Sequence, residues 1–248
     1  MRLLLDLGNT RIKWAAQAPG APDFIARGAV LHGAGSIADR WPLAEPPDAV
    51  WLCSVTDPSR TEAVVQAVGR AWGVPVHRVA SQAAGFGVRS AYAEPWRMGA
   101  DRWAALVGAR SLGSGPVCIL DLGTALTGDL LDAQGTHLGG IIAPGRQLLQ
   151  QSLRGGTAQV ITDAPAPAVE EGEAGLGRTT DDCVAWGVTH SVIGCCLRIV
   201  GVARARLGAD AAVLLTGGDA PWAQPLLPFA SRIEPDLVLR GLAVIADA

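Results

Sequence analysis

The chain of 248 residues carries little charge and almost no lysine. Charged residues make up 17% of it, the formal net charge is -3, and Lys13 is the only lysine. A negative net charge supplies no basic electrostatic field that would attract nucleic acid, so we expect no nucleic-acid partner. A Walker A loop requires a Gly-Lys pair, whereas Lys13 follows Ile12. The sequence therefore excludes a P-loop nucleotide site.

The cysteines and the apolar runs exclude two further classes. The five cysteines form no Cys-x-x-Cys pair, and their odd number inside apolar runs indicates reduced thiols, so we expect a cytoplasmic protein without a disulfide framework. The longest apolar stretch, 183–197, contains His190 and is followed by Arg198. It predicts no membrane span, because a span needs about 20 apolar residues. A hydrophobic content of 49% predicts a folded core instead.

The predicted secondary structure repeats after the Gly-Ser-Gly-Pro segment at 113–116. Each half opens with three strands and continues with helices and further strands. The predicted strands are 2–7, 11–17, 24–31, 49–55, 76–80, 117–122, 124–132, 136–142 and 212–216; the predicted helices are 58–71, 99–112 and 180–207, with others after Pro144 and Pro235; and 33–38, 81–98 and 163–172 are expected to be irregular. The repeat predicts an α/β duplication with two lobes, 1–114 and 115–248, and a cleft between them.

One short motif ends a strand in both halves. Asp6-Leu7-Gly8-Asn9-Thr10 closes the first strand, and Asp121-Leu122-Gly123-Thr124 closes its counterpart 115 positions later. Each copy predicts a buried strand that delivers a carboxylate and then turns at glycine. The amides and hydroxyls after the glycine can donate to phosphate oxygens. A single copy is equally consistent with a hairpin turn closed by an Asx hydrogen bond, but the second copy favours phosphoryl transfer.

A third pattern opens the helix predicted at 99–112. Gly99-Ala100-Asp101-Arg102 places a carboxylate and a guanidinium in the first turn, and Tyr92 lies in the loop before it. An aspartate there can simply stabilise the helix dipole, and Arg102 can form an ordinary surface ion pair. Alternatively, Asp101 can accept the proton of a substrate hydroxyl as phosphoryl transfer proceeds.

These motifs, with Gly139–Gly145 and Leu215–Ala220, resemble in their order those of the type III pantothenate kinase family. The resemblance implies the acetate and sugar kinase/Hsp70/actin fold, with duplicated actin-like (ribonuclease H-like) lobes and a nucleotide cleft. It also implies a homodimer and ATP-dependent phosphorylation of pantothenate to 4'-phosphopantothenate, the first step of coenzyme A biosynthesis. A kinase of the same fold for another small hydroxylated substrate and a non-catalytic regulatory homologue are the alternatives.

The resemblance also implies roles for individual residues. Asp101 would be the general base, and the substrate would be bound by Tyr92, Gly99, Ala100, Asp101, Arg102 and Thr180. The phosphate-binding segment falls on Asp6, Leu7, Gly8, Asn9, Thr10, Arg11, Ile12 and Lys13, with Thr124 as a further ATP contact. The family's metals would be Mg²⁺ at Asp6, through water, and a monovalent cation, K⁺ or NH₄⁺, at Asp121. Gly217 and Gly218 would pass close to the adenosine.

The chain departs from the family pattern at two positions. Leu126 stands where threonine is common, which affects the detail of the phosphate site, and Glu94 stands where a small amide is common, which affects the polarity near the substrate. The two strand-end aspartates, Asp101 and Arg102 are all present. Their joint presence disfavours the regulatory alternative, because a binding module has little need of a general base.

Overall fold

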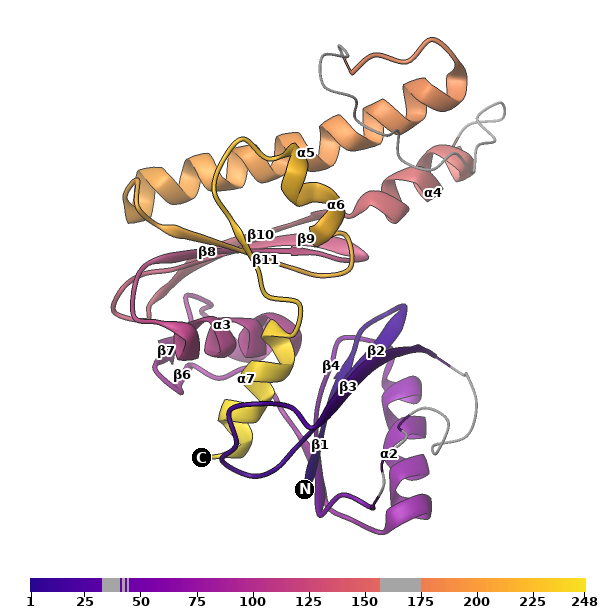
Figure 1. Ribbon diagram of the computed structural model, residues 1–248, viewed down its shortest axis with the longest axis vertical. Coiled ribbons are helices and arrows are strands. Elements are labelled where there is room, and N and C mark those ends of the chain that lie inside the picture. The colour runs from indigo at the N-terminus through magenta and orange to yellow at the C-terminus, as the bar shows by residue number, and fades with distance from the viewer. Residues whose placement is uncertain (33–40, 42, 44, 157–174) are drawn as a thin grey trace. The chain divides into compact units, whose positions relative to one another are not determined.

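The computed structural model of the chain describes residues 1–32, 41, 43, 45–156 and 175–248 (Figure 1). The loops expected at 33–38 and 163–172 lie outside the described residues. The chain divides into two compact units: unit 1 consists of Met1–Gly115, Leu131–Gly139 and Asp236–Ala248, and unit 2 consists of Pro116–Leu130 and Gly140–Pro235. The lobes expected at 1–114 and 115–248 follow the two sequence repeats, whereas the compact units group two later segments with the first repeat.

The helices and strands agree with the predicted pattern over most of the described chain. The strands are β1 (Arg2–Leu7), β2 (Arg11–Gln17), β3 (Ala26–Leu31), β4 (Ala49–Ser54), β5 (Val76–Arg78), β6 (Ala84–Gly85), β7 (Val88–Arg89), β8 (Val117–Leu122), β9 (Ala125–Leu131), β10 (His137–Pro144), β11 (Ala212–Thr216) and β12 (Arg232–Ile233). The helices are α2 (Pro58–Trp72), α3 (Ala100–Leu112), α4 (Arg146–Gly156), α5 (Thr180–Leu207), α6 (Ala220–Ala223) and α7 (Leu237–Ala246), with 3₁₀ turns at Pro95–Arg97 and Gln224–Leu226. The sequence missed β6, β7, β12 and α6, because elements of two to four residues are too short to show a periodicity.

Each unit is built on a five-stranded sheet with the same strand order. The order is β3-β2-β1-β4-β5 in unit 1 and β10-β9-β8-β11-β12 in the other sheet. β1 pairs antiparallel with β2 and parallel with β4, and β8 likewise pairs parallel with β11. The predicted α/β duplication is therefore confirmed, with β1 and β8 as the equivalent central strands.

The side chains of β1 alternate between two faces of the sheet. Leu3, Leu5 and Leu7 lie in a hydrophobic cluster with Val64 and Val68 of α2. The alternate residues of β1, Asp6 among them, face the opposite side. On that side α7 contacts β1, β2 and β4 (Figure 1). Asp6 thus belongs to the α7 face of the sheet rather than to the α2 face.

Two glycines allow α7 to pack closely against α3. A Cβ atom on Gly108 would collide with the carbonyl oxygen of Leu237, and a Cβ atom on Gly241 would collide with that of Ala104. The two helices therefore meet backbone to backbone. This packing joins the last helix of the chain to unit 1.

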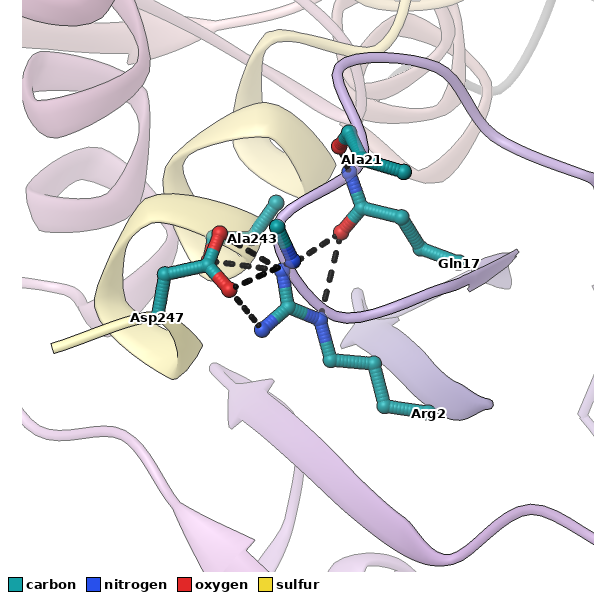
Figure 2. A network of polar contacts seen from close by, with 6 residues as sticks. Arg2, Gln17, Ala21, Ala243 and Asp247 are labelled. Carbon is teal, nitrogen blue, oxygen red and sulfur yellow. Dashed lines mark hydrogen bonds and ion pairs between the residues drawn. The ribbon is translucent and has the colours of Figure 1, made fainter.

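Arg2 binds the C-terminal end of α7 to the sheet (Figure 2). Its guanidinium donates hydrogen bonds of 2.7–3.2 Å to Gln17 Oε1, to the carbonyl oxygen of Ala243 and to both carboxylate oxygens of Asp247. Arg2 is buried, and a buried guanidinium requires such partners. The hydrogen bond from Arg2 is also the main reason why the pKa of Asp247 lies below its usual value.

Helix α5 corrects one expectation. The helix predicted at 180–207 is confirmed, but the expectation that no segment has spanning length is wrong: Thr180–Leu207 is long and apolar enough to cross a membrane by length and composition alone. Arg198 does not end the helix because its side chain is exposed. Val192, Cys196 and Ile199 lie in the hydrophobic core of unit 2, where α5 packs against its sheet (Figure 1). A buried core helix of this kind passes the same test of length and composition.

Candidate functional site

Asp6 lies near the carboxyl end of β1 in unit 1, and only 8% of it is exposed. It is in register with Lys13 on β2 and with Cys53 on β4. The Cys53 thiol donates to Asp6 Oδ1 at 3.6 Å. Burial, followed by the negative charges of Asp6 and Asp101, raises the pKa of this thiol well above its usual value. Cys53 is therefore protonated at neutral pH and acts as a hydrogen-bond donor.

The turn after Asp6 is a tight hairpin. The Gly8 N–H donates to the carbonyl oxygen of Arg11 at 3.1 Å, and Asn9 and Thr10 are exposed at the tip. The side chains of Leu7 and Ile12, both predicted to contact ATP, lie in the hydrophobic core. Any contact of these two residues with phosphate is thus restricted to the backbone.

Asp101 occupies the first turn of α3. The N-cap of this helix is Gly99, which offers no side chain, and Asp101 Oδ1 accepts a hydrogen bond from the Arg102 N–H at 2.7 Å. A Cβ atom on Gly99 would collide with the Asp101 carboxylate. Glycine at this position leaves the Asp101 carboxylate in its present place, and Asp101 is not the N-cap residue.

Arg102 and Tyr92 form one cluster in unit 1. Arg102 is only 6% exposed, so it is not the surface ion pair considered for it. Its Nη1 donates to the Tyr92 hydroxyl at 2.7 Å, and its guanidinium lies 5.6 Å from the centre of the Tyr92 ring. The buried His137 stacks on the same ring, with 6.2 Å between centroids and 20° between planes. By contrast, Glu94 is exposed and forms an ion pair with Arg97 at 3.0 Å.

Sequence reasoning missed His137 and Cys53. His137 begins β10, far from Tyr92 along the chain, and no spacing links the two residues. Cys53 could be found only by placing β4 as the parallel neighbour of β1, so that its residues lie beside Asp6. That inference requires the strand register, which the sequence does not contain.

In unit 2 the second strand-end aspartate, Asp121, lies against a turn that only glycine can form. It is in register with Thr216 on β11, and the next residue, Gly217, has a positive φ of 89°. A Cβ atom on Gly217 would collide with the Asp121 carboxylate and with the carbonyl oxygen of Leu122. The glycine is required here both for its backbone conformation and for the close approach.

The turn after Asp121 occupies the same place as the turn after Asp6 but is one residue shorter, because β9 begins at Ala125. The Gly123 N–H donates to the carbonyl oxygen of Ala125 at 3.0 Å. Gly145 covers this turn: its N–H donates to the Thr124 carbonyl at 3.1 Å, and a Cβ atom on it would collide with the same backbone. Leu126, the departure from the family pattern, lies in the hydrophobic core.

Beside this turn lies an ionic cluster that sequence reasoning only partly found. Arg146 Nη2 donates to Asp219 Oδ1 at 2.9 Å, and its guanidinium lies 4.9 Å from the ring centre of Trp222. The Asp219 N–H donates to the Leu122 carbonyl at 2.9 Å, which ties the cluster to the end of β8. Thr180, by comparison, is the exposed first residue of α5, whose N-cap is Thr179.

The structure thus groups the predicted site residues within each unit. Unit 1 contains Asp6, Tyr92, Gly99, Asp101 and Arg102, and unit 2 contains Asp121, Thr124, Thr180, Gly217 and Gly218. Within the part of the chain that the structure describes, no three His, Cys, Asp or Glu side chains gather as a metal site. Each strand-end carboxylate therefore has to be considered as a separate cation ligand.

The donor sets of both carboxylates suit hard cations. Asp6 and Asp121 offer carboxylate oxygens, which Mg²⁺ and alkali cations prefer to nitrogen or sulfur. Beside Asp121, the buried hydroxyl of Thr216 has no hydrogen-bond partner among the described residues. A buried hydroxyl of this kind and a neighbouring carbonyl oxygen fit a cation ligand shell without nitrogen or sulfur.

Solved structures with low identity share this fold over almost the whole chain. A protein from Campylobacter jejuni assigned to the Baf family of transcriptional activators is 17% identical, with a TM-score of 0.61 and coverage of 99% of this chain and 98% of that chain. A protein from Sinorhizobium meliloti assigned as a 2-dehydro-3-deoxygalactonokinase is 13% identical, with a TM-score of 0.57 and the same coverage. The chain therefore shares the duplicated α/β fold of these proteins, with one five-stranded sheet in each half.

The sequence comparisons identify the family. The family model described as type III pantothenate kinase matches residues 2–202. The type III pantothenate kinase of Halorhodospira halophila is 41% identical over 253 residues, covering 98% of this chain and 96% of the relative. That of Chromobacterium violaceum is 38% identical over 253 residues and covers both chains completely. The chain belongs to the type III pantothenate kinase family.

Proposed function

We propose that this protein transfers the γ-phosphoryl group of ATP to the primary hydroxyl of pantothenate. The product, 4'-phosphopantothenate, is the first intermediate of coenzyme A biosynthesis. Family membership supports the reaction. The observation that carries the proposal is the cluster in unit 1, in which Gly99 makes room for the Asp101 carboxylate beside a buried Arg102 held by Tyr92.

In this proposal Asp101 is the general base. The pantothenate hydroxyl oxygen forms the new bond to the γ-phosphorus, the bond from that phosphorus to the bridging oxygen of ADP breaks, and the hydroxyl proton passes to Asp101. Arg102 supplies a fixed positive charge for the substrate or the transferring group. Its hydrogen bond to Tyr92 restrains the guanidinium, so little reorganisation is needed as the reaction proceeds.

ATP would be held by the two glycine turns. In unit 1 the segment from Gly8 to Lys13 supplies backbone N–H groups, two short polar side chains and Lys13, and in unit 2 Thr124 adds a hydroxyl. Asp6 is the carboxylate that would hold Mg²⁺ through water, and Asp121 would hold K⁺ or NH₄⁺. When bound, these cations neutralise phosphate charge. Gly217 and Gly218 would leave space for the adenosine.

A coupled assay that measures ADP release tests the reaction. With ATP, Mg²⁺ and K⁺ present, we expect ADP release that depends on pantothenate and accumulation of phosphopantothenate. Other small alcohols, such as glycerol, serve as acceptor controls. Release that glycerol supports equally well would favour a kinase for a different substrate, and a folded protein with no pantothenate-dependent release would contradict the proposal.

The same assay separates the two strand-end aspartates. Asp6→Asn should raise the Mg²⁺-ATP concentration needed for half-maximal rate, whereas Asp121→Asn should chiefly change the response to K⁺, because each substitution removes a charged ligand of one cation. Initial rates over crossed titrations of Mg²⁺-ATP and K⁺ measure both effects. An unchanged K⁺ profile in Asp121→Asn would count against the cation assignment.

The active form in this proposal is a homodimer, with Thr180 contributing to substrate binding near the interface. Among the described residues, seven of the eleven large hydrophobic side chains that are exposed lie between residues 138 and 197, in β10, α4, α5 and the segment before α5. Their number in this stretch of the chain supports the dimer, because a subunit interface buries apolar side chains that a monomer would expose. Sedimentation equilibrium should detect a dimer at micromolar concentration, and a purely monomeric distribution would refute the dimer.

The expected cellular setting follows from the chemistry. The partners are pantothenate, ATP and a second copy of the chain, and we infer a cytoplasmic location without membrane or nucleic-acid partners. The described cysteines are all free thiols, which agrees with a reducing compartment.

A further inference from the structure

In each unit, the residue in register with the strand-end aspartate on the neighbouring parallel strand has a side chain with a polar hydrogen. Cys53 on β4 is in register with Asp6, and Thr216 on β11 is in register with Asp121. Both positions are fully buried, although the residue before each of them is a leucine in the hydrophobic core. The two side chains differ in their contacts: the Cys53 thiol has the Asp6 carboxylate as a partner, whereas the Thr216 hydroxyl has no hydrogen-bond partner among the described residues.

The backbone confirms that the two positions are equivalent. The carbonyl oxygen of Leu52 accepts a hydrogen bond of 2.7 Å from the Val79 N–H. The carbonyl oxygen of Leu215 accepts a bond of 2.8 Å from the Glu234 N–H, at the matching place in the other sheet. Cys53 directly follows the first of these leucines and Thr216 the second. The polar residue is thus a property of the repeated fold and not an isolated cysteine.

In unit 1 this side chain contacts a carboxylate that the proposed function uses. The sulfur lies 3.6 Å from Asp6 Oδ1, on the flank opposite Lys13. A thiol at its ordinary pKa is protonated at neutral pH, so the group beside Asp6 is a neutral S–H donor. A neutral donor restrains the carboxylate without cancelling its negative charge, whereas a cationic donor would oppose the binding of Mg²⁺.

We infer that Cys53 is a positioning residue for the nucleotide step: its S–H group fixes the orientation of the Asp6 carboxylate toward the phosphate-binding turn. The inference rests on the proposed role of Asp6. It predicts that a side chain of similar shape with a polar hydrogen can replace Cys53, and that one without a polar hydrogen cannot. Thr216 shows that the fold accommodates a threonine at the equivalent position.

The test compares Cys53→Thr with Cys53→Val, two variants of nearly equal shape that differ in one hydroxyl group. Loss of the hydrogen bond in Cys53→Val should raise KM for Mg²⁺-ATP by about three- to tenfold relative to Cys53→Thr, with the KM for pantothenate unchanged. The stabilisation of the folded protein by Mg²⁺-ATP in thermal melts should weaken in parallel. A general packing defect would lower the melting temperature in the absence of nucleotide without this selective effect.

Cys118→Val is the matched control. Cys118 is a buried thiol in the hydrophobic core of unit 2, and burial raises its pKa to about 12. Its removal should leave the KM for Mg²⁺-ATP unchanged. Equal KM values and equal melting shifts in Cys53→Thr and Cys53→Val would overturn the inference. If either β-branched variant fails to fold, the pair Cys53→Ser and Cys53→Ala makes the same comparison.

The melting measurement separates this inference from the proposed function. If the wild type responds to Mg²⁺-ATP in melts but does not phosphorylate pantothenate, the proposed substrate is wrong, and the comparison at Cys53 still gives an answer. If pantothenate is phosphorylated and the Cys53 variants do not differ, the inference is wrong and the proposed function stands.

Discussion

Asp101→Asn is expected to lower kcat by roughly 100-fold or more, while the protein remains folded and still binds ATP. Asparagine keeps the shape of the side chain, and its amide oxygen can still accept the hydrogen bond from the Arg102 N–H. It cannot accept the proton of the substrate hydroxyl. A loss confined to kcat would therefore identify the proton acceptor, and steady-state kinetics together with thermal melting on one preparation measure both properties.

Asp57→Asn provides the control for a purely structural aspartate. Asp57 is the N-cap of α2, and its carboxylate accepts the Ser59 N–H at 2.8 Å. Because this residue has no place in the proposed chemistry, the control variant should turn over pantothenate at nearly the normal rate. A well-folded Asp101→Asn protein whose kcat resembles that of Asp57→Asn would refute the assignment of the base.

Gly241→Ala is expected to destabilise unit 1 by about 3 kcal/mol or more, because the new methyl group would collide with the carbonyl oxygen of Ala104. In an unobstructed helix the same change stabilises by up to about 1 kcal/mol, so the packing of α7 against α3 reverses the sign. Urea titration followed by circular dichroism measures the difference in the free energy of unfolding.

Gly69→Ala is the matched change in an open position of the same unit. Gly69 lies within α2, and no atom lies within 4 Å of the place where its Cβ would stand. This variant should be as stable as the wild type or more stable. If Gly241→Ala were equally tolerated, the close contact between α3 and α7 would not exist in solution.

The sequence was most informative where a pattern is local. The apolar run, the aspartate and the glycine that end β1 and β8 are adjacent in the chain, so the strand, its carboxylate and its turn could all be predicted. The repeat of the motif then predicted the repeat of the sheets, which the common strand order confirms. The glycine before Asp101 was likewise found, although its reason, the space needed by a carboxylate, became clear only in the structure.

The remaining features depend on contacts between distant segments. Cys53 reaches Asp6 only through the parallel register of β4, and His137 reaches Tyr92 from a strand in the second half of the chain. Neither of these contacts has a sequence spacing of its own, so composition and periodicity could not predict them.

The place of α7 in unit 1 has a consequence for how the protein folds during synthesis. Arg2 and Asp247 are separated by 245 positions, and all of unit 2 is translated between them. One face of the unit 1 sheet therefore stays uncovered during synthesis, because α7 is translated only after unit 2. We expect the later unit to acquire its native packing first, and the nascent first sheet to be the species that chaperones protect.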